Sequence, residues 1–295
     1  MLAMALRQPD GSFVGEAPIA PPAGLLAALA ARCGGGRVLV GFDHPIGLPA
    51  AYAEPAGLRP FPNWLAEMED ITWDRLRTPA ASPDEIGRSR PFYPLRPGGT
   101  SRAALATGHG VAGYGDLLRR CDLGTSGRPP ACCMFWTLGP KQCGRAALAG
   151  WHEILRPALR GDAAPALWPF DGALADLLAR GGSVVAETYP AEFYAELGPR
   201  RRFSKRRQAD RQALGDGLRA AAGRAGLQPG TELAAAIAHG FGPGARGENA
   251  FDATVGMIGM LLTLRGLRPA DPPPDPAIRR HEGWMLGLDA ATLRG

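Results

Sequence analysis

Two short hydrophobic runs in the chain each end in an acidic residue that is soon followed by a proline. The first run, residues 38 to 42, is followed by Asp43, and the second, residues 183 to 187, ends in Glu187. Runs rich in valine and bounded by turn residues predict buried strands. Because the carboxyl ends of such strands border the crevice where open α/β sheets bind ligands, the pattern predicts one site with both carboxylates. Taken singly, each acid also suits a local role, an Asx turn at Asp43 and a loop contact at Glu187.

The remaining patterns predict a mixed α/β protein. Residues 2 to 6 form a predicted strand, and a turn at 9 to 12 lets the chain return as an antiparallel partner from Phe13. Further helices are expected over residues 22 to 33, 171 to 180, 205 to 222, 231 to 239 and from about Asn249 onward. Between residues 44 and 165, proline, glycine, arginine and aromatic residues occur without a clear period. We therefore expect one domain, residues 1 to 295, that contains a long irregular insertion or cap at 44 to 165.

The last predicted helix has two stripes of residues at helical spacing. The first is a hydrophobic face and consists of Phe251, Val255, Ile258 and Leu262. The second consists of Asp252, Gly256, Gly259 and Thr263. Because glycine in a helix costs about 1 kcal/mol relative to alanine, two glycines on one face predict a close approach to the sheet. Asp252, with Glu248 one turn earlier, would then lie near the strand ends; alternatively, Asp252 complements the positive end of the helix dipole.

Several carboxylates at one place form the ligand set of a hard divalent cation. The candidate catalytic residues and metal ligands are Asp43, Glu187 and Asp252, with Glu248 as a further ligand. Because unpaired acids repel one another, such a group is favourable when Mg²⁺ or Mn²⁺ neutralises it. Two such ions activate water and stabilise the leaving oxygen in phosphodiester hydrolysis. The acids therefore predict a two-metal phosphodiesterase.

Much of the positive charge lies downstream of Glu187. The chain has a net charge of +5, and one run interrupted by Asp210 holds more positive charge than that. The run comprises Arg200, Arg201, Arg202, Lys205, Arg206, Arg207 and Arg211. We expect it to contact the phosphates of a nucleic acid, with a solvated helix face as the alternative.

Composition limits the other options. The longest hydrophobic run is about half the roughly 20 residues that span a bilayer, so no membrane span is expected. The first residues lack the pattern of a secretory signal, which makes the cytoplasm the expected location. Five cysteines without a C-x-x-C pair predict free thiols, the alternative being a zinc site from Cys132, Cys133, Cys143 and a histidine. His44 is expected to be a turn residue or an aid to proton transfer.

Four motifs in a fixed order suggest a family. FDHPIGLP, AETYPAEF, ENAFDATVG and HEGWMLGL resemble the predicted ribonuclease H-like nuclease family catalogued as domain of unknown function 429, in particular a bacterial branch with a long insertion after the first motif. The segment from Trp168 to Phe170 matches that branch as well. The resemblance implies a ribonuclease H-like mixed sheet flanked by helices. It also implies that Asp43, Glu187 and Asp252 occupy the family's acidic positions.

The start of the chain departs from the family pattern. Relatives are expected to have a further strand with an aspartate upstream of the strand at residues 2 to 6, and this chain starts after it. We expect a start codon assigned too far downstream, with a trimmed, inactive form as the alternative. Two functions follow, a metal-dependent nuclease acting on DNA or RNA and a non-catalytic nucleic-acid-binding or adaptor protein that keeps the fold. An enzyme acting on a small phosphate ester is a third.

Overall fold

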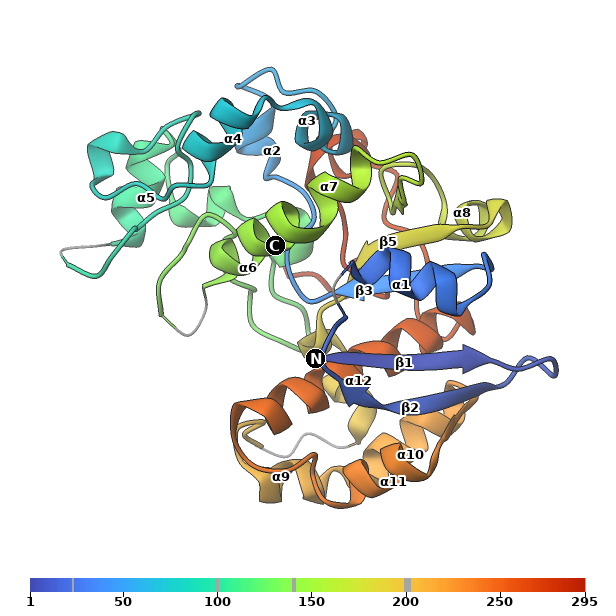
Figure 1. Cartoon of the computed structure of the whole chain (residues 1–295). Helices are drawn as coiled ribbons and strands as arrows, with labels where there is room; N and C mark the ends of the chain where they lie inside the picture. Colours follow the sequence, from blue (N-terminus) through green and yellow to red (C-terminus); the bar gives the residue numbers. More distant parts are fainter. Residues whose placement is uncertain (23, 99–100, 140–141, 199–202, 295) are drawn as a thin grey trace. The chain divides into compact units, whose positions relative to one another are not determined.

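The chain divides into two compact units. The structure, a computed structural model, describes residues 1–22, 24–98, 101–139, 142–198 and 203–294 (Figure 1). Unit 1 comprises Met1–Leu25, Thr188–Ala270 and Leu286–Asp289. Unit 2 comprises Leu26–Glu187, Asp271–Met285 and Ala290–Gly295. The stretch from 44 to 165, expected as an insertion, therefore falls wholly within unit 2.

Unit 1 contains a mixed three-stranded sheet in the order β1-β2-β6. Strand β1 (Leu2–Arg7) pairs antiparallel with β2 (Phe13–Ile19), and the two form the dark blue hairpin of Figure 1. Strand β6 (Leu227–Pro229) pairs parallel with β2. In the turn, the Ser12 amide donates to Asp10 Oδ1 at 2.9 Å. The hairpin predicted from the sequence is confirmed.

Helices complete the core of unit 1. They are η6 (Pro190–Leu197), α9 (Gln208–Ala213), α10 (Gly215–Arg224), α11 (Thr231–Ala238) and α12 (Gly244–Leu264). Buried side chains from these helices, such as Leu218, Leu233 and Phe251, form one hydrophobic cluster. Ala3 and Ala5, at alternate positions of β1, pack against that cluster. Because alternate strand residues share one face, the alanine side of β1 faces the core.

Helix α12 carries both stripes that the sequence predicts. The residues of its hydrophobic stripe are all buried, and so are those of its glycine stripe. The close neighbour of the glycines differs from the prediction: a Cβ on Gly259 would lie 2.2 Å from Phe193 Cδ2, which belongs to η6. The missing side chain therefore makes room for a phenylalanine ring of η6 and not for the sheet.

Unit 2 contains a parallel three-stranded sheet in the order β3-β5-β4. Its strands are β3 (Val38–Phe42), β4 (Ala166–Leu167) and β5 (Ser183–Glu187). The two runs that lead to acids are thus adjacent strands, as predicted, in a register that pairs Phe42 with Glu187. The single mixed sheet that was expected is replaced, among the described residues, by two small sheets in separate units.

Short helices account for most of the regular structure in the rest of unit 2. The α-helices are α1 (Leu25–Arg32), which begins at the unit boundary, α2 (Ala50–Ala53), α3 (Phe61–Glu67), α4 (Asp70–Leu76), α5 (Arg102–Gly108), α6 (Cys143–Gly150), α7 (Arg156–Leu159) and α8 (Leu174–Arg180). Single turns occur at η1 (Pro83–Glu85), η2 (Tyr114–Leu117), η3 (Arg120–Asp122), η5 (Trp151–Leu155), η7 (Ile278–Glu282) and η8 (Ala290–Thr292). The ring centroid of Phe92 lies 5.4 Å from that of Phe135 and 6.3 Å from that of Trp151. The stretch expected to be irregular therefore has its own aromatic core.

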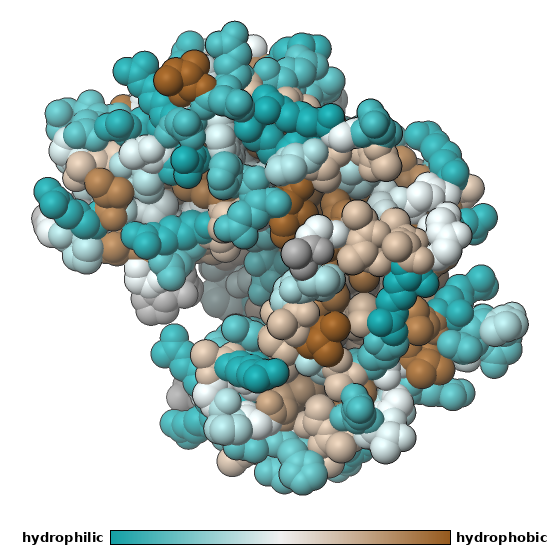
Figure 2. Space-filling view, in the orientation of Figure 1, coloured by the Kyte–Doolittle hydropathy of each residue, from teal (hydrophilic) through white to brown (hydrophobic). Residues whose placement is uncertain are grey.

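No helix among the described residues combines the length and hydrophobicity that a membrane span requires. On the face shown in Figure 2, hydrophobic side chains are interspersed with hydrophilic ones. Few large hydrophobic residues are exposed, the most exposed being Ile71 at 75%.

Candidate functional site

Glu187, at the end of β5, is buried and its carboxylate is bound by an arginine. Oε1 accepts a hydrogen bond from Arg119 Nη2 at 2.8 Å, and Oε2 accepts one from Arg119 Nη1 at 2.7 Å. Oε2 also accepts from the backbone amide of Ile46 at 2.7 Å. The two-point contact with a guanidinium neutralises the carboxylate and fixes its orientation. Glu187 therefore ties the end of β5 to the loop that follows β3.

Arg119 lies between two carboxylates and is fully buried. Besides Glu187, it binds Asp122, through Nε to Oδ2 at 3.0 Å and Nη2 to Oδ1 at 2.9 Å. Nη1 also donates to the carbonyl of Glu282 at 3.2 Å. Each of the five N–H groups of the guanidinium thus has an acceptor. Burial alone would lower the pKa of Arg119, but the adjacent carboxylates outweigh it and raise this pKa well above its usual value.

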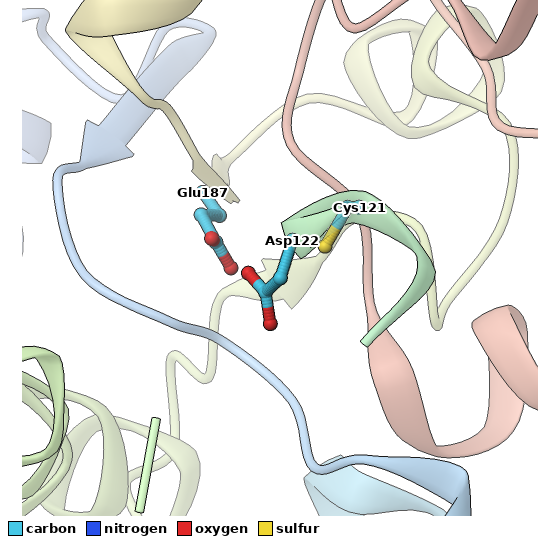
Figure 3. Close-up of side chains that lie close together, drawn as sticks. All are labelled: Cys121, Asp122 and Glu187. Atoms are coloured by element: carbon cyan, nitrogen blue, oxygen red, sulfur yellow. The ribbon is translucent and has the colours of Figure 1, made fainter. Parts of the chain in front are cut away.

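Cys121, Asp122 and Glu187 are the group of side chains, among the described residues, that could hold a metal ion. Their ligand atoms lie within 4.8 Å of one another. Figure 3 shows the two carboxylates pointing toward each other, with the thiol on the same turn as Asp122. However, the guanidinium already binds both carboxylates, and burial raises the pKa of the Cys121 thiol well above its usual value. Since a thiolate is the form that binds metal, this set does not fit a cation while Arg119 is in place.

Glu282, in the motif HEGWMLGL, is a third buried acid of unit 2, besides Asp122 and Glu187. Its Oε1 accepts from the amide of Ala50 at 3.1 Å and its Oε2 from the amide of Arg120 at 2.9 Å. Burial raises the pKa of Glu282, and these two hydrogen bonds oppose the rise. The carboxylate thus joins α2 to η3. The sequence analysis did not identify Glu282 as a candidate site residue, and it did not identify the ion pair of Arg119 with Asp122. The only sequence signal for that ion pair is the R-x-x-D spacing.

Asp43 and His44 are adjacent in the chain but have different environments. Asp43 is exposed at the bend after β3, and the strand register places Phe42, not Asp43, opposite Glu187. His44 is half-buried, and its Nδ1 donates to the carbonyl of Pro45 at 3.2 Å. Its Nε2 has no partner among the described atoms, and burial lowers the pKa of His44 to about 4. The imidazole is therefore neutral at pH 7 and has the contacts of a packed turn residue.

Asp252 and Glu248 lie in unit 1, so the predicted acids are distributed over both units. Asp252 Oδ1 accepts from the Tyr194 hydroxyl at 2.6 Å, and Oδ2 pairs with the Lys205 ammonium. The same ammonium lies 3.5 Å from Glu248 Oε1. The helix dipole stabilises acids within the first turn of a helix. Because α12 begins at Gly244, Asp252 lies beyond that first turn. The dipole therefore does not explain this acid, whereas the shared lysine does.

The predicted basic run separates into different environments. Arg200, Arg201 and Arg202 lie outside the described residues, and Arg206 and Arg207 are exposed. Arg211, in contrast, is fully buried in unit 1, and its Nε donates to the Gly240 carbonyl at 2.9 Å. Its other nitrogens donate to the carbonyls of Lys205 and Gly242. Because buried carbonyls need donors, Arg211 is a structural residue and does not belong to a phosphate-binding surface.

Comparisons with known proteins add no relative. No family model matches the chain, and neither the curated proteins nor the solved structures contain a match. The described residues define a mixed α/β protein with two three-stranded sheets. The resemblance to a ribonuclease H-like family therefore rests on the four sequence motifs.

Proposed function

We propose that the protein is a metal-dependent nuclease that hydrolyses phosphodiester bonds of DNA or RNA. The observation that carries the proposal is the pair of carboxylates on α12, Glu248 and Asp252, which share one ammonium group, that of Lys205. Two carboxylates and one ammonium have a net charge of −1, which favours a further cation at this point. The ribonuclease H-like fold in this proposal rests on the four sequence motifs, because the antiparallel hairpin and the parallel strand pair lie in separate sheets.

The side chains of this cluster suit a hard divalent ion. Carboxylate oxygens are the ligands that Mg²⁺ and Mn²⁺ prefer, and the Tyr194 hydroxyl orients Asp252 from its other oxygen. The side chain of Lys205 is 39% exposed, so it can move into solvent at little cost. Bound by Glu248 and Asp252, the ion would supply Lewis acidity at a phosphate. The released ammonium, with Arg206 and Arg207, would then contact the nucleic-acid backbone.

The two predicted acids of unit 2, Asp43 and Glu187, have different proposed roles. Asp43, exposed at the bend after β3, is a candidate ligand within unit 2 itself and is not part of the Glu248–Asp252 cluster of unit 1. Glu187 remains an acid of the candidate site, but a cation would have to displace Arg119 to reach it. Its role in the proposal is therefore to position the loop that begins after β3.

Calorimetric titration with Mn²⁺ tests the metal site without a guess about the substrate. We expect wild-type protein to bind Mn²⁺ in the millimolar range or tighter, and Asp252→Asn and Glu248→Gln to weaken binding by about tenfold or more. Glu232→Gln, which changes an exposed acid on α11, is the matched control and should bind as wild type does. Equal affinity in all four proteins would contradict the assignment of Glu248 and Asp252.

Nucleic-acid binding is tested by fluorescence anisotropy with single-stranded and double-stranded oligonucleotides. A double variant, Arg206→Gln with Arg207→Gln, should bind more weakly and should lower the salt slope by about 2, one for each phosphate that the variant no longer neutralises. Arg219→Gln, on α10, is the control because its side chain is exposed and paired with Asp216. Cleavage of the same oligonucleotides with Mn²⁺ present, abolished in Asp252→Asn, completes the test.

A second candidate function is a non-catalytic nucleic-acid-binding or adaptor protein. The observation in its favour is that the buried acids already have basic partners, Arg119 for Glu187 and Lys205 for Asp252. Oligonucleotide binding that depends on Arg206 and Arg207 but needs no Mn²⁺ and leads to no cleavage would favour this candidate.

A further inference from the structure

Two of the five thiols of the chain, Cys132 and Cys143, hydrogen-bond to each other within unit 2. Neither cysteine is in a disulfide. Cys143 is the first residue of α6, and Cys132 lies in the non-helical segment that precedes it. No histidine or carboxylate joins them in a metal-binding group within the described part of the chain. The zinc site considered from the sequence is therefore not formed, and the pair needs another explanation.

The backbone holds the two cysteines together. The amide of Gly144 donates to the carbonyl of Trp136 at 3.0 Å. A Cβ on Gly144 would lie only 2.5 Å from the carbonyl oxygen of Met134. Glycine thus lets the segment at 134 to 136 lie directly against the first turn of α6. This backbone contact brings the segment that follows Cys132 close to the residue that follows Cys143.

Cys133, next to Cys132, is directed elsewhere. Its Sγ donates to the carbonyl of Leu117 at 3.4 Å, and the side chain is fully buried. Burial raises the pKa of the Cys133 thiol, so it remains protonated at pH 7. Although the sequence shows two adjacent cysteines, the structure selects Cys132 as the partner of Cys143.

The surroundings of Cys132 favour its thiolate. The Cys143 thiol donates to it, and this hydrogen bond is the main cause that lowers the pKa of Cys132 to about 6. The hydroxyl of Tyr114 lies 3.6 Å from Cys132 Sγ, and burial raises the pKa of Tyr114, so this hydroxyl stays protonated and donates. The guanidinium of Arg102 lies 4.8 Å from the centre of the Tyr114 ring and adds positive charge nearby. As the donor of the pair, Cys143 has a raised pKa.

We propose that Cys132 and Cys143 form a reversible disulfide when the protein meets a peroxide. The sulfur of Cys132 attacks one oxygen of hydrogen peroxide; an S–O bond forms, the O–O bond breaks, and the departing hydroxide takes up a proton to become water. The sulfur of Cys143, as its proton leaves, then attacks the sulfur of the resulting sulfenic acid. An S–S bond forms, the S–O bond breaks, and the hydroxide leaves with that proton as a second water. Two thiols are oxidised and one peroxide is reduced.

The disulfide would fasten α6 to the segment before it. Closing a loop of this size restricts the unfolded chain, so oxidation should raise the midpoint of thermal unfolding by about 5 °C, and dithiothreitol should reverse the shift. Cys143 is partly exposed, whereas Cys132 is 6% exposed. A small oxidant such as hydrogen peroxide is therefore expected to react faster than a bulky disulfide reagent.

The experiment is thiol counting on the full chain. Protein is treated with one equivalent of hydrogen peroxide, unfolded, labelled with a maleimide and mapped by mass spectrometry. We expect the loss of two labelled thiols and a peptide in which Cys132 is linked to Cys143, both restored by dithiothreitol. Five labelled thiols after treatment, or a linkage that involves Cys133, would overturn the proposal.

Variants separate the roles of the two cysteines. Cys143→Ala, at a partly exposed position, should leave Cys132 as a sulfenic acid that dimedone traps, whereas Cys132→Ser should retain all its remaining thiols. Cys33→Ser is the matched control and should still form the disulfide. Tyr114→Phe removes a donor to the thiolate and should slow the reaction at pH 7 several-fold; an unchanged rate in this variant would contradict the role of the hydroxyl. Because the peptide map of wild-type protein needs no variant, a poorly folded variant does not weaken the test.

Discussion

Replacing Arg119 with methionine tests whether the buried acids of unit 2 depend on their guanidinium. Methionine has a similar length and no charge, so the change leaves Asp122 and Glu187 buried without their shared cation. The guanidinium makes four hydrogen bonds to these two carboxylates, at 2.7 to 3.0 Å. Removing one partner of a buried ion pair costs about 3–5 kcal/mol. With two carboxylates left unpaired, we expect a loss of about 5 kcal/mol in the free energy of unfolding.

The assay is urea unfolding at pH 7, followed by tryptophan fluorescence. A loss of about 5 kcal/mol is a large part of the roughly 5–15 kcal/mol that stabilises a typical domain, so the midpoint should shift strongly. Acidification toward pH 4 protonates the unpaired carboxylates and should restore part of the stability. The control is Arg77→Met, because the ion pair of Arg77 with Asp74 is exposed and should contribute at most about 1 kcal/mol.

Two outcomes would refute this reasoning. A loss below about 1 kcal/mol in Arg119→Met would mean that the carboxylates are solvated or otherwise neutralised. A loss that does not change with pH would mean that packing of the side chain, and not its charge, stabilises the unit. Stability regained by adding Mn²⁺ to Arg119→Met would show that the Cys121–Asp122–Glu187 group accepts a cation once the guanidinium is gone.

Two further predictions concern the folded core. Because the pKa of His44 is lowered from 6.5 to about 4, only the unfolded state binds a proton between these values, so wild-type protein should lose about 3 kcal/mol as the pH falls from 6.5 to 4. His44→Leu should flatten this part of the curve of unfolding free energy against pH, and an unchanged slope would contradict it. On α12, a Cβ at Gly256 would have its nearest neighbour at 3.5 Å, whereas one at Gly259 would lie 2.2 Å from the Phe193 ring. Gly256→Ala should therefore raise stability by about 1 kcal/mol and Gly259→Ala should lower it by about 1–3 kcal/mol, as urea unfolding would show.

The local elements of the fold could be predicted from the sequence, but their assembly could not. The strands that lead to Asp43 and Glu187 and the hydrophobic stripe of α12 follow from short periods and turn residues, and the structure contains all of them. Which strands share a sheet depends on pairings between segments far apart in the chain, for which a single sequence holds no signal. The division of the strands into two sheets was therefore missed.

The candidate site was harder to predict than the fold for a related reason. A carboxylate at a strand end predicts a cation nearby, but the sequence does not tell whether that cation is a metal or a side chain. The partner of Glu187, Arg119, lies 68 residues away in a stretch without period. Arg211 was assigned to a charged surface because it ends a basic run, yet two of its three carbonyl partners come from a loop about 30 residues downstream. Partners of this kind become visible only in three dimensions.

The two side-chain cations also differ in how readily a metal could replace them. Arg119 is fully buried, and moving it would leave five donors and two carboxylates to be satisfied elsewhere. The side chain of Lys205 is 39% exposed, and a divalent ion bound by Glu248 and Asp252 would replace the charge that its ammonium supplies. A divalent ion would therefore compete with Lys205 far more easily than with Arg119. For this reason Glu248 and Asp252, and not Glu187, are the acids at which metal binding should be sought first.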